Sequence, residues 1–368
     1  MSRPPHESAE PGRSRQRARP HSPRLLLLLA TVLVALGFSS EGRGEGAPTA
    51  GVFQKGFTLG GWWRDDYLNR GLPAQIALLR AAGVEWVALT PRWFQADRRS
   101  TRLFPHPEQS PSDESLRTVV GLLQSQGVHV FLKPQVDLLG PGFRGEISFD
   151  SEEDWKRWFQ SYREFIDHYA RLAAELHASL FCVGVELDGT RHRAHDWREV
   201  IREVREQYPG PLVYAANFGR DRDIAFWDAL DYVGIDAYYP VAGKPDPSLP
   251  EVEGRWSDVL RELHGWVQKL KRPVLFTEIG YRSIAGSGIE PWEWKRSAAP
   301  SGPEQALLYR GALQALWSEP WIAGVYWWQL LTTPPRDPAS DDGYTPQGKP
   351  AWSVIREFYA RERTAPKP

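Results

Sequence analysis

Two glutamates, Glu186 and Glu278, each stand at the end of a short, mostly apolar run of the sequence. An unpaired charge is costly to bury, so a carboxylate in such a place is expected to have either a partner or a function. Two facing carboxylates can cleave a glycosidic bond, because one protonates the leaving oxygen while the other acts at the anomeric carbon. Either glutamate alone is better explained as a buried, hydrogen-bonded structural residue or as a solvent-facing loop residue. As a pair, they are better explained by catalysis.

Further polar and aromatic residues follow the ends of the predicted strands. Amine, amide, carboxyl and phenol groups can hydrogen-bond sugar hydroxyls, and an indole face can stack on a pyranose ring. The candidate substrate-binding residues are Lys133, Gln135, Asp137, Asn217, Tyr238, Trp292, Trp327 and Trp328. Neighbours on a strand point to opposite faces, so one of Trp327 and Trp328 is expected to pack in the core. For Trp292, a distal sugar site and an anchor for its loop are equally good interpretations.

Eight β-rich segments alternate with eight amphipathic segments along the chain. The predicted strands are residues 55–59, 85–89, 128–133, 180–185, 212–215, 232–235, 273–277 and 322–327. The predicted helices are residues 72–82, 112–126, 152–176, 196–207, 223–230, 256–270, 302–317 and 352–361. This alternation predicts an α/β fold with a single (β/α)8 TIM barrel and long loops after strands 6, 7 and 8. A doubly wound sheet is the alternative, but the segment after the first strand, Gly60-Gly61-Trp62-Trp63, lacks a phosphate-binding glycine pattern. In a barrel, Glu186 and Glu278 end the fourth and seventh strands and can point across one mouth.

The composition is that of a soluble globular protein and excludes several function classes. Hydrophobic residues make up 41% and charged residues 25%, and 45 basic residues face 46 acidic ones, so a nucleic-acid partner is not expected. Cys182 is the one cysteine, which excludes an internal disulfide and a cysteine-based zinc site. His192, His195 and the acidic residues of segment 337–342 are better explained as solvated loops than as metal ligands, so no metal and no cofactor is expected. The 17 tryptophans fit a protein that stacks flat ligand faces.

The first 40 residues carry six arginines and two glutamates, and an apolar run at residues 25–37 follows Arg24. A basic stretch before a short apolar run is typical of a secretory signal, and the run is short for a membrane span. The predicted domains are a signal peptide or anchor (1–40), a linker (41–52), one barrel domain (53–362) and a disordered tail (363–368). The protein is expected to be secreted or periplasmic, with a membrane contact only if the apolar run stays uncleaved.

The ordered set of strand-end motifs resembles glycoside hydrolase family 113, a family of retaining β-mannanases with the (β/α)8 fold. The motifs are Lys133-Pro134-Gln135-Val136-Asp137, Arg144-Gly145-Glu146-Ile147, Gly184-Val185-Glu186-Leu187, Tyr214-Ala215-Ala216-Asn217, Gly234-Ile235-Asp236-Ala237-Tyr238-Tyr239-Pro240, Phe276-Thr277-Glu278-Ile279-Gly280-Tyr281, Pro291-Trp292, Tyr326-Trp327-Trp328 and Gly348-Lys349-Pro350-Ala351. The resemblance implies that Glu186 is the acid/base, that Glu278 is the nucleophile, and that no metal is needed. Gln135 stands where the family tends to have histidine, and Val185 where a small polar residue or asparagine is usual. These two departures bear on the sugar preference rather than on the reaction.

The residues and the resemblance together predict a retaining β-glycoside hydrolase, namely an endo-β-1,4-mannanase acting on mannan or mannooligosaccharides. One alternative is a hydrolase of the same clan that acts on another β-glycan. The other is a noncatalytic carbohydrate-binding barrel, in which the glutamates serve as hydrogen-bond partners. In every case the expected partner is an oligosaccharide or polysaccharide.

Overall fold

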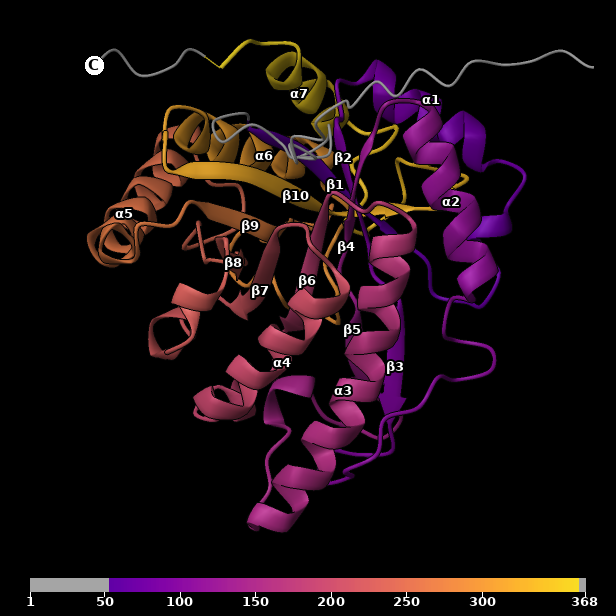
Figure 1. Ribbon diagram of the computed structural model, residues 1–368. Coiled ribbons are helices and arrows are strands. Elements are labelled where there is room, and N and C mark those ends of the chain that lie inside the picture. Colours follow the sequence, from indigo (N-terminus) through magenta and orange to yellow (C-terminus); the bar gives the residue numbers. More distant parts are fainter. Residues whose placement is uncertain (1–52, 364–368) are drawn as a thin grey trace, which may run out of the picture. The chain divides into compact units, whose positions relative to one another are not determined.

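Eight parallel strands close into a barrel in the computed structural model, which describes residues 53–363 (Figure 1). The barrel strands are β1 (Gln54–Gly60), β2 (Trp86–Leu89), β4 (His129–Leu132), β6 (Leu180–Val185), β7 (Leu212–Asn217), β8 (Tyr232–Asp236), β9 (Val274–Ile279) and β10 (Ile322–Leu331). They follow one another in this order around the barrel, and β10 closes it by pairing with β1. The predicted (β/α)8 TIM barrel is confirmed.

The strands contribute side chains to two apolar cores, one inside the barrel and one between the strands and the helices, because successive residues of a strand point to opposite faces. In β2, for example, Trp86 and Ala88 pack inside the barrel, while Val87 and Leu89 pack against the helices. Both faces of each strand are therefore buried, which explains why the strands are continuous apolar runs in the sequence.

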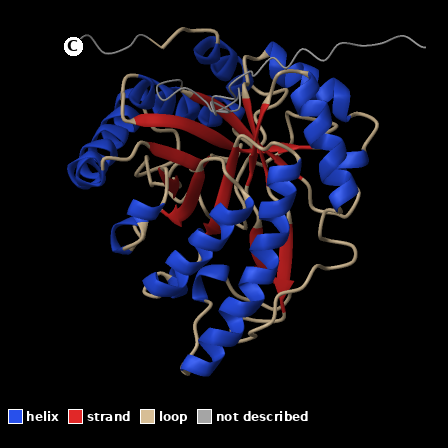
Figure 2. Cartoon of the chain, in the orientation of Figure 1, coloured by secondary structure: helices blue, strands red, loops and turns tan. Residues whose placement is uncertain are grey.

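Helices surround the strands, as Figure 2 shows. They are α1 (Leu72–Ala81), α2 (Asp113–Ser125), α3 (Glu152–Glu175), α4 (Ala194–Gln207), α5 (Leu249–Val267), α6 (Gly302–Trp317) and α7 (Pro350–Tyr359). A serine caps the start of four of them by accepting a backbone N–H three residues further on; these are Ser112, Ser151, Ser248 and Ser301. Within residues 53–363, no helix is long and apolar enough to cross a membrane.

Two helix predictions need correction. Segment 223–230 is not an α-helix but contains the last residue of one short 3-10 turn, η4 (Asp221–Asp223), and the whole of another, η5 (Trp227–Ala229). The adjacent Phe226 and Trp227 are both buried, and the Trp227 indole donates to the Asp221 carbonyl at 2.9 Å. Helix α5 begins at Leu249 rather than at residue 256, because the Ser248 cap starts it earlier and shortens the loop before it.

A small parallel sheet beside the barrel was not predicted. It consists of β3 (Arg92–Gln95) and β5 (Gln135–Leu138), which follow barrel strands β2 and β4 after a short break. Figure 1 shows both strands beside α3, and the Trp93 ring lies 5.6 Å from the Phe165 ring of that helix. This sheet matters for function because it carries Arg92, Gln135 and Asp137.

The ends of the predicted domain lie close to the limits of the described residues. Residues 1–52 and 364–368, which hold the predicted signal, the linker and most of the predicted tail, lie outside them. Arg363, the first residue of that tail, donates to the carbonyls of Trp317 (2.9 Å) and Ile322 (2.7 Å). Arg363 therefore belongs to the barrel domain.

Candidate active site

Glu278 points into the barrel mouth, the end of the barrel where the strands finish, because β9 carries a β-bulge there. Strand β9 pairs with β8 as Ile235 with Phe276 and then Asp236 with Glu278, so β9 uses one residue more than its neighbour. In a regular strand Phe276 and Glu278 would face the same side, and Phe276 faces the helices. The bulge reverses this alternation and turns the Glu278 carboxylate toward the mouth, a frequent use of bulges next to active sites.

The Lys133 ammonium lies between two carboxylates. Its Nζ is 3.0 Å from Asp236 Oδ1 and 2.5 Å from Glu278 Oε1. Burial disfavours the ammonium, but Asp236 and Glu278 outweigh this effect and raise the pKa of Lys133 above its ordinary value. The side chain has 0% exposed surface, so the prediction that Lys133 binds sugar hydroxyls is wrong. Lys133 instead supplies a fixed positive charge beside Glu278.

Both carboxylate oxygens of Glu278 have hydrogen-bond donors. Gln135 Nε2 donates to Oε1 at 3.3 Å, and the Tyr238 hydroxyl donates to Oε2 at 2.8 Å. Burial raises the pKa of Tyr238 well above 10, so the phenol keeps its proton and remains a donor. Lys133, Gln135 and Tyr238 together hold the carboxylate in one orientation. Contacts of Gln135 and Tyr238 with a sugar stay a prediction.

Glu186 follows β6 in a left-handed backbone conformation, with φ at +52°. This conformation is uncommon for a residue with a side chain and persists only where the surroundings enforce it. Burial, Asp236 and Glu278 raise the pKa of the Glu186 carboxyl to about 8, although Arg144 and Lys133 oppose them. This shift favours the protonated form of Glu186, which is the form that a general acid needs.

Asp137 and Asn217 lie near the mouth but have protein partners. The Asp137 carboxylate accepts from Arg144 Nη2 and from Arg92 Nη1, each at 3.3 Å. Asn217, at the end of β7, lies beside Asp188; burial raises the pKa of Asp188, and Asn217 opposes this effect. Asp137 is 31% exposed, and the predicted contact of either residue with substrate stays a prediction.

The three candidate tryptophans have different environments. Trp327 has 0% exposed surface and stacks on Tyr309 of α6 at 4.0 Å between ring centroids, so its predicted contact with sugar is wrong. Trp328 is half-buried, and its ring lies 5.8 Å from that of Trp62 in an edge-on arrangement. Trp292 is 40% exposed and lies against Phe218 at 5.2 Å. Trp292 and Trp328 are the members of this set with surface for a ligand.

Three residues of the site were not among the predicted ones. Asp236 ends β8, so its position at a strand end could have identified it from the sequence. Its role is defined by its contact with Lys133 and by Thr277, whose hydroxyl donates to Asp236 Oδ1 at 2.7 Å. Burial and Glu278 raise the pKa of Asp236 to about 7. Arg144 begins the motif Arg144-Gly145-Glu146-Ile147, to which the sequence analysis assigns no role. Arg92 lies on strand β3, which was not predicted. No local pattern marks either arginine as a partner of Asp137.

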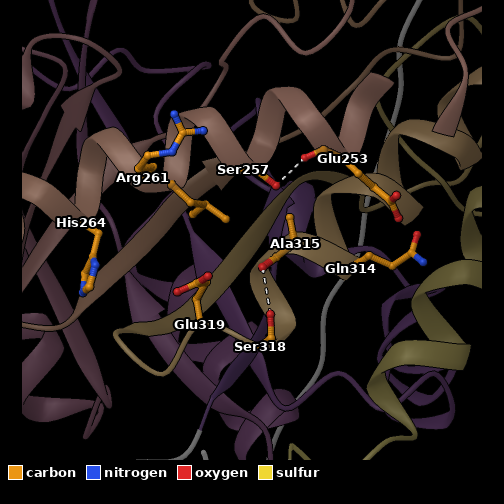
Figure 3. Close-up of a pocket in the computed structure, with 9 residues that line it drawn as sticks. Glu253, Ser257, Arg261, His264, Gln314, Ala315, Ser318 and Glu319 are labelled. Carbon is orange, nitrogen blue, oxygen red and sulfur yellow. Dashed lines mark hydrogen bonds between the residues drawn. The ribbon is translucent and has the colours of Figure 1, made fainter. Parts of the chain in front are cut away.

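Other features of the described residues carry no site. Cys182 is buried inside the barrel, and burial raises the pKa of its thiol to about 12. No group of three His, Cys, Asp or Glu side chains within residues 53–363 is placed to hold a metal ion. A groove of about 450 Å³ between α5 and α6 is lined by Glu253, Ser257, His264 and Glu319 among others (Figure 3). Its Ser257 and Ser318 hydroxyls donate to carbonyls of their own helices, and neither Glu186 nor Glu278 lines it.

Comparison with known proteins places the chain in a family. The model of glycoside hydrolase family 113 matches residues 58–349. A solved family 113 β-1,4-mannanase superposes with a TM-score of 0.78 at 29% identity, over 84% of this chain and 100% of that one. The β-mannanase AaManA from Alicyclobacillus acidocaldarius, solved in complex with ManMIm, has a TM-score of 0.76 at 32% identity, over 84% of this chain and 97% of that one. A family 5 mannosidase from Rhizomucor miehei shares the fold alone, at 12% identity and a TM-score of 0.57. A search of curated proteins with this sequence finds no match. The chain belongs to glycoside hydrolase family 113.

Proposed function

We propose that this glycoside hydrolase is a retaining endo-β-1,4-mannanase, with Glu278 as the nucleophile and Glu186 as the acid/base. The observation that carries the proposal is the contrast between the two carboxyls. Glu278 is an acceptor held by Lys133, Gln135 and Tyr238, while burial keeps the proton on Glu186. Two carboxyls with opposite protonation states are what retaining hydrolysis requires.

The reaction proceeds in two steps. A Glu278 oxygen forms a bond to the anomeric carbon while the glycosidic C–O bond breaks, and the Glu186 proton passes to the leaving oxygen. Glu186, now a carboxylate, takes a proton from water, and the water oxygen attacks the anomeric carbon. The bond to Glu278 breaks, Glu278 leaves as a carboxylate, and Glu186 is protonated again.

The mannan specificity is supported by the solved relatives, which are β-mannanases. The two departures from the family pattern lie in different environments. Val185 is buried among the residues of the barrel interior, where it has no surface for a sugar. Gln135 touches the nucleophile, so it is the departure that bears on the sugar bound there.

Hydrolysis of β-1,4-mannan and mannohexaose beside cellohexaose and xylohexaose tests the proposal, with Glu186→Ala and Glu278→Ala as controls. We expect short mannooligosaccharides from the wild type, and proton NMR should show the β-anomer as the first product. Cleavage of another glycan in the panel would refute the substrate, and an α-anomer would refute retention. Binding without cleavage of any substrate would favour a noncatalytic barrel instead.

We also infer that residues 1–40 direct export, so that the enzyme meets its polysaccharide outside the cytoplasm. The support is the order of a basic stretch and the apolar run at 25–37. A polymer too large to enter the cell also requires a hydrolase outside it.

A further inference from the structure

A chain of alternating charges leads from Glu186 to the rim of the barrel. Glu186 Oε2 accepts from Arg144 Nη1 at 3.1 Å, and Arg144 Nη2 donates to Asp137 Oδ1 at 3.3 Å. Arg92 Nη1 donates to Asp137 Oδ2 at 3.3 Å, and its Nη2 donates to the Trp62 carbonyl at 2.9 Å. The Arg92 guanidinium also lies 4.6 Å from the centre of the Trp62 ring. Each member of the chain is therefore fixed by the next.

We propose that Arg144, oriented by Asp137 and Arg92, is a positioning residue that sets how readily Glu186 gives and takes its proton. The inference rests on the proposed function, because it concerns the acid/base role of Glu186. A retaining enzyme uses the same carboxyl as an acid in the first step and as a base in the second. A carboxyl with too high a pKa is a poor acid, and one with too low a pKa has lost its proton before the first step.

The backbone keeps Arg144 beside Glu186. Arg144 opens the short turn η2 (Arg144–Glu146), which packs against η3 (Asp188–Thr190) in the segment after Glu186. A Cβ atom on Gly189 would lie 2.2 Å from the Ile147 carbonyl oxygen, and one on Gly145 would lie 3.1 Å from the Glu186 carbonyl oxygen. The two segments therefore touch backbone to backbone at glycines, which leaves the guanidinium little freedom to move away.

The groups around Glu186 oppose one another. Asp236 on β8 and Glu278 on β9 raise the pKa of Glu186, while Arg144 and Lys133 lower it. Tyr214 on β7, whose hydroxyl accepts from the Leu187 N–H at 3.2 Å, and Asp188 on the segment after Glu186 are further titratable groups close to it. Arg144 is the cation that hydrogen-bonds the Glu186 carboxyl among residues 53–363, and it shares its guanidinium with Asp137. Asp137 thus competes with Glu186 for one positive charge.

This competition predicts shifts of opposite sign in the alkaline limb of the pH profile of kcat/KM. In Arg144→Gln the limb should move up by about one pH unit, because the cation that stabilises the Glu186 anion is gone. In Asp137→Asn the limb should move down by about half a unit or more, because Arg144 then serves Glu186 alone. Arg92→Gln should move it up, because Asp137 then draws Arg144 more strongly. Arg98→Gln is the matched control, since it removes an exposed arginine that pairs with Glu146 of η2 without entering the chain.

The first measurement tests whether the alkaline limb belongs to Glu186. It compares the pH profile of Glu186→Gln with that of the wild type on an aryl mannoside whose leaving group needs no proton. If that variant keeps the alkaline limb, Glu186 is not the acid and the proposed function fails. If it loses the limb but Asp137→Asn leaves the wild-type limb in place or raises it, only the present inference fails. Arg144→Gln could fail to fold, which would be seen as the loss of its unfolding transition. Such a failure would not affect Asp137→Asn, whose alkaline limb is expected to move to lower pH in a folded protein. That variant therefore decides the inference by itself.

Discussion

At the scale of single residues, Lys133 stabilises two buried acidic side chains of the site. Asp236 and Glu278 both lie against its ammonium, and Thr277 supplies a further donor to Asp236. Two buried carboxylates without this cation would repel each other and lose their hydration. The lysine thereby places a positive charge beside the Glu278 carboxylate while having no contact with solvent.

Replacing this lysine should therefore damage stability and activity together. We expect Lys133→Met to lose about 3–5 kcal/mol of unfolding free energy, because one partner of a buried ion pair is removed. The double variant Lys133→Met/Asp236→Asn removes one of the two stranded carboxylates and should regain part of that loss. Urea denaturation of both variants measures the effect. A double variant no more stable than the single one would contradict the charge argument.

The two tryptophans Trp327 and Trp292 should respond in opposite ways to replacement by alanine. Trp327→Ala should cost about 3–5 kcal/mol of stability, because it empties a packed position between β10 and α6. Trp292→Ala should cost less than about 1 kcal/mol, because the side chain is partly exposed. If Trp292 stacks on sugar, its loss should raise KM for mannohexaose roughly two- to tenfold, which matches about 0.5–1.5 kcal/mol. Unchanged KM would make Trp292 a loop anchor.

Glu186 should make the protein less stable at alkaline pH. A glutamate titrates near 4.5 in an unfolded chain, whereas in this fold burial raises the pKa of Glu186 to about 8. Between these values the folded state binds more protons, so this contribution to stability falls as pH rises. Glu186→Gln mimics the protonated form and should remove that part of the fall. We expect its gain in Tm over the wild type to be larger at pH 8 than at pH 5, and an equal gain at both would contradict the raised pKa.

At the scale of elements, the sequence predicted the barrel well because each barrel strand is a buried apolar run. The same logic placed Glu186 and Glu278 at strand ends. It could not predict the bulge in β9, because a bulge depends on how a strand pairs with its neighbours rather than on its own residue pattern. It also could not find Arg92, since β3 forms only by pairing with β5 across a long stretch of chain.

Lys133 and Trp327 were assigned to sugar for a related reason. A strand end says that a residue lies near the mouth, but not whether its side chain reaches solvent. Lys133 is covered by the very carboxylates that it holds, and Trp327 points to the helices by strand alternation. Exposure is decided by neighbours distant in sequence.

The contact between η2 and η3 gives a prediction at this scale. Gly189→Ala should force the two turns apart, because the new Cβ would lie 2.2 Å from a backbone oxygen. A displacement of Arg144 from Glu186 by about 1 Å should lower kcat/KM by roughly 10- to 100-fold. Gly121→Ala in α2 is the control, since nothing lies within 4 Å of its Cβ and alanine favours a helix. Equal kinetics for the two variants would show that the turn contact has no functional role.

At the scale of the whole molecule, the tryptophans fall into a buried group and an exposed group. Seven tryptophans of residues 53–363 are buried and fill the two apolar cores: Trp86, Trp155, Trp158, Trp197, Trp227, Trp256 and Trp327. Trp63, Trp292 and Trp294 are exposed, and all three lie on loops that leave the mouth end of β1 or β9. The tryptophan content alone therefore did not distinguish ligand binding from packing. The position of the exposed members at the mouth end of the barrel makes them the candidates for ligand contact.

The direction of the barrel strands is relevant to the proposed export. All barrel strands are parallel, so the chain enters β1 at the end opposite the mouth, where Phe53 packs on Trp317 at 5.1 Å. Removing residues 1–40 should therefore leave kcat/KM and Tm unchanged, because the site residues found within residues 53–363 gather at the opposite end of the barrel from Phe53. In a Gram-negative host, we expect the full chain in the periplasm with a shortened N-terminus, or in the membrane fraction if the apolar run is retained. N-terminal sequencing of each fraction separates these outcomes. A full-length chain found in the cytosol would refute export, because the basic stretch and the apolar run would then not act as a signal.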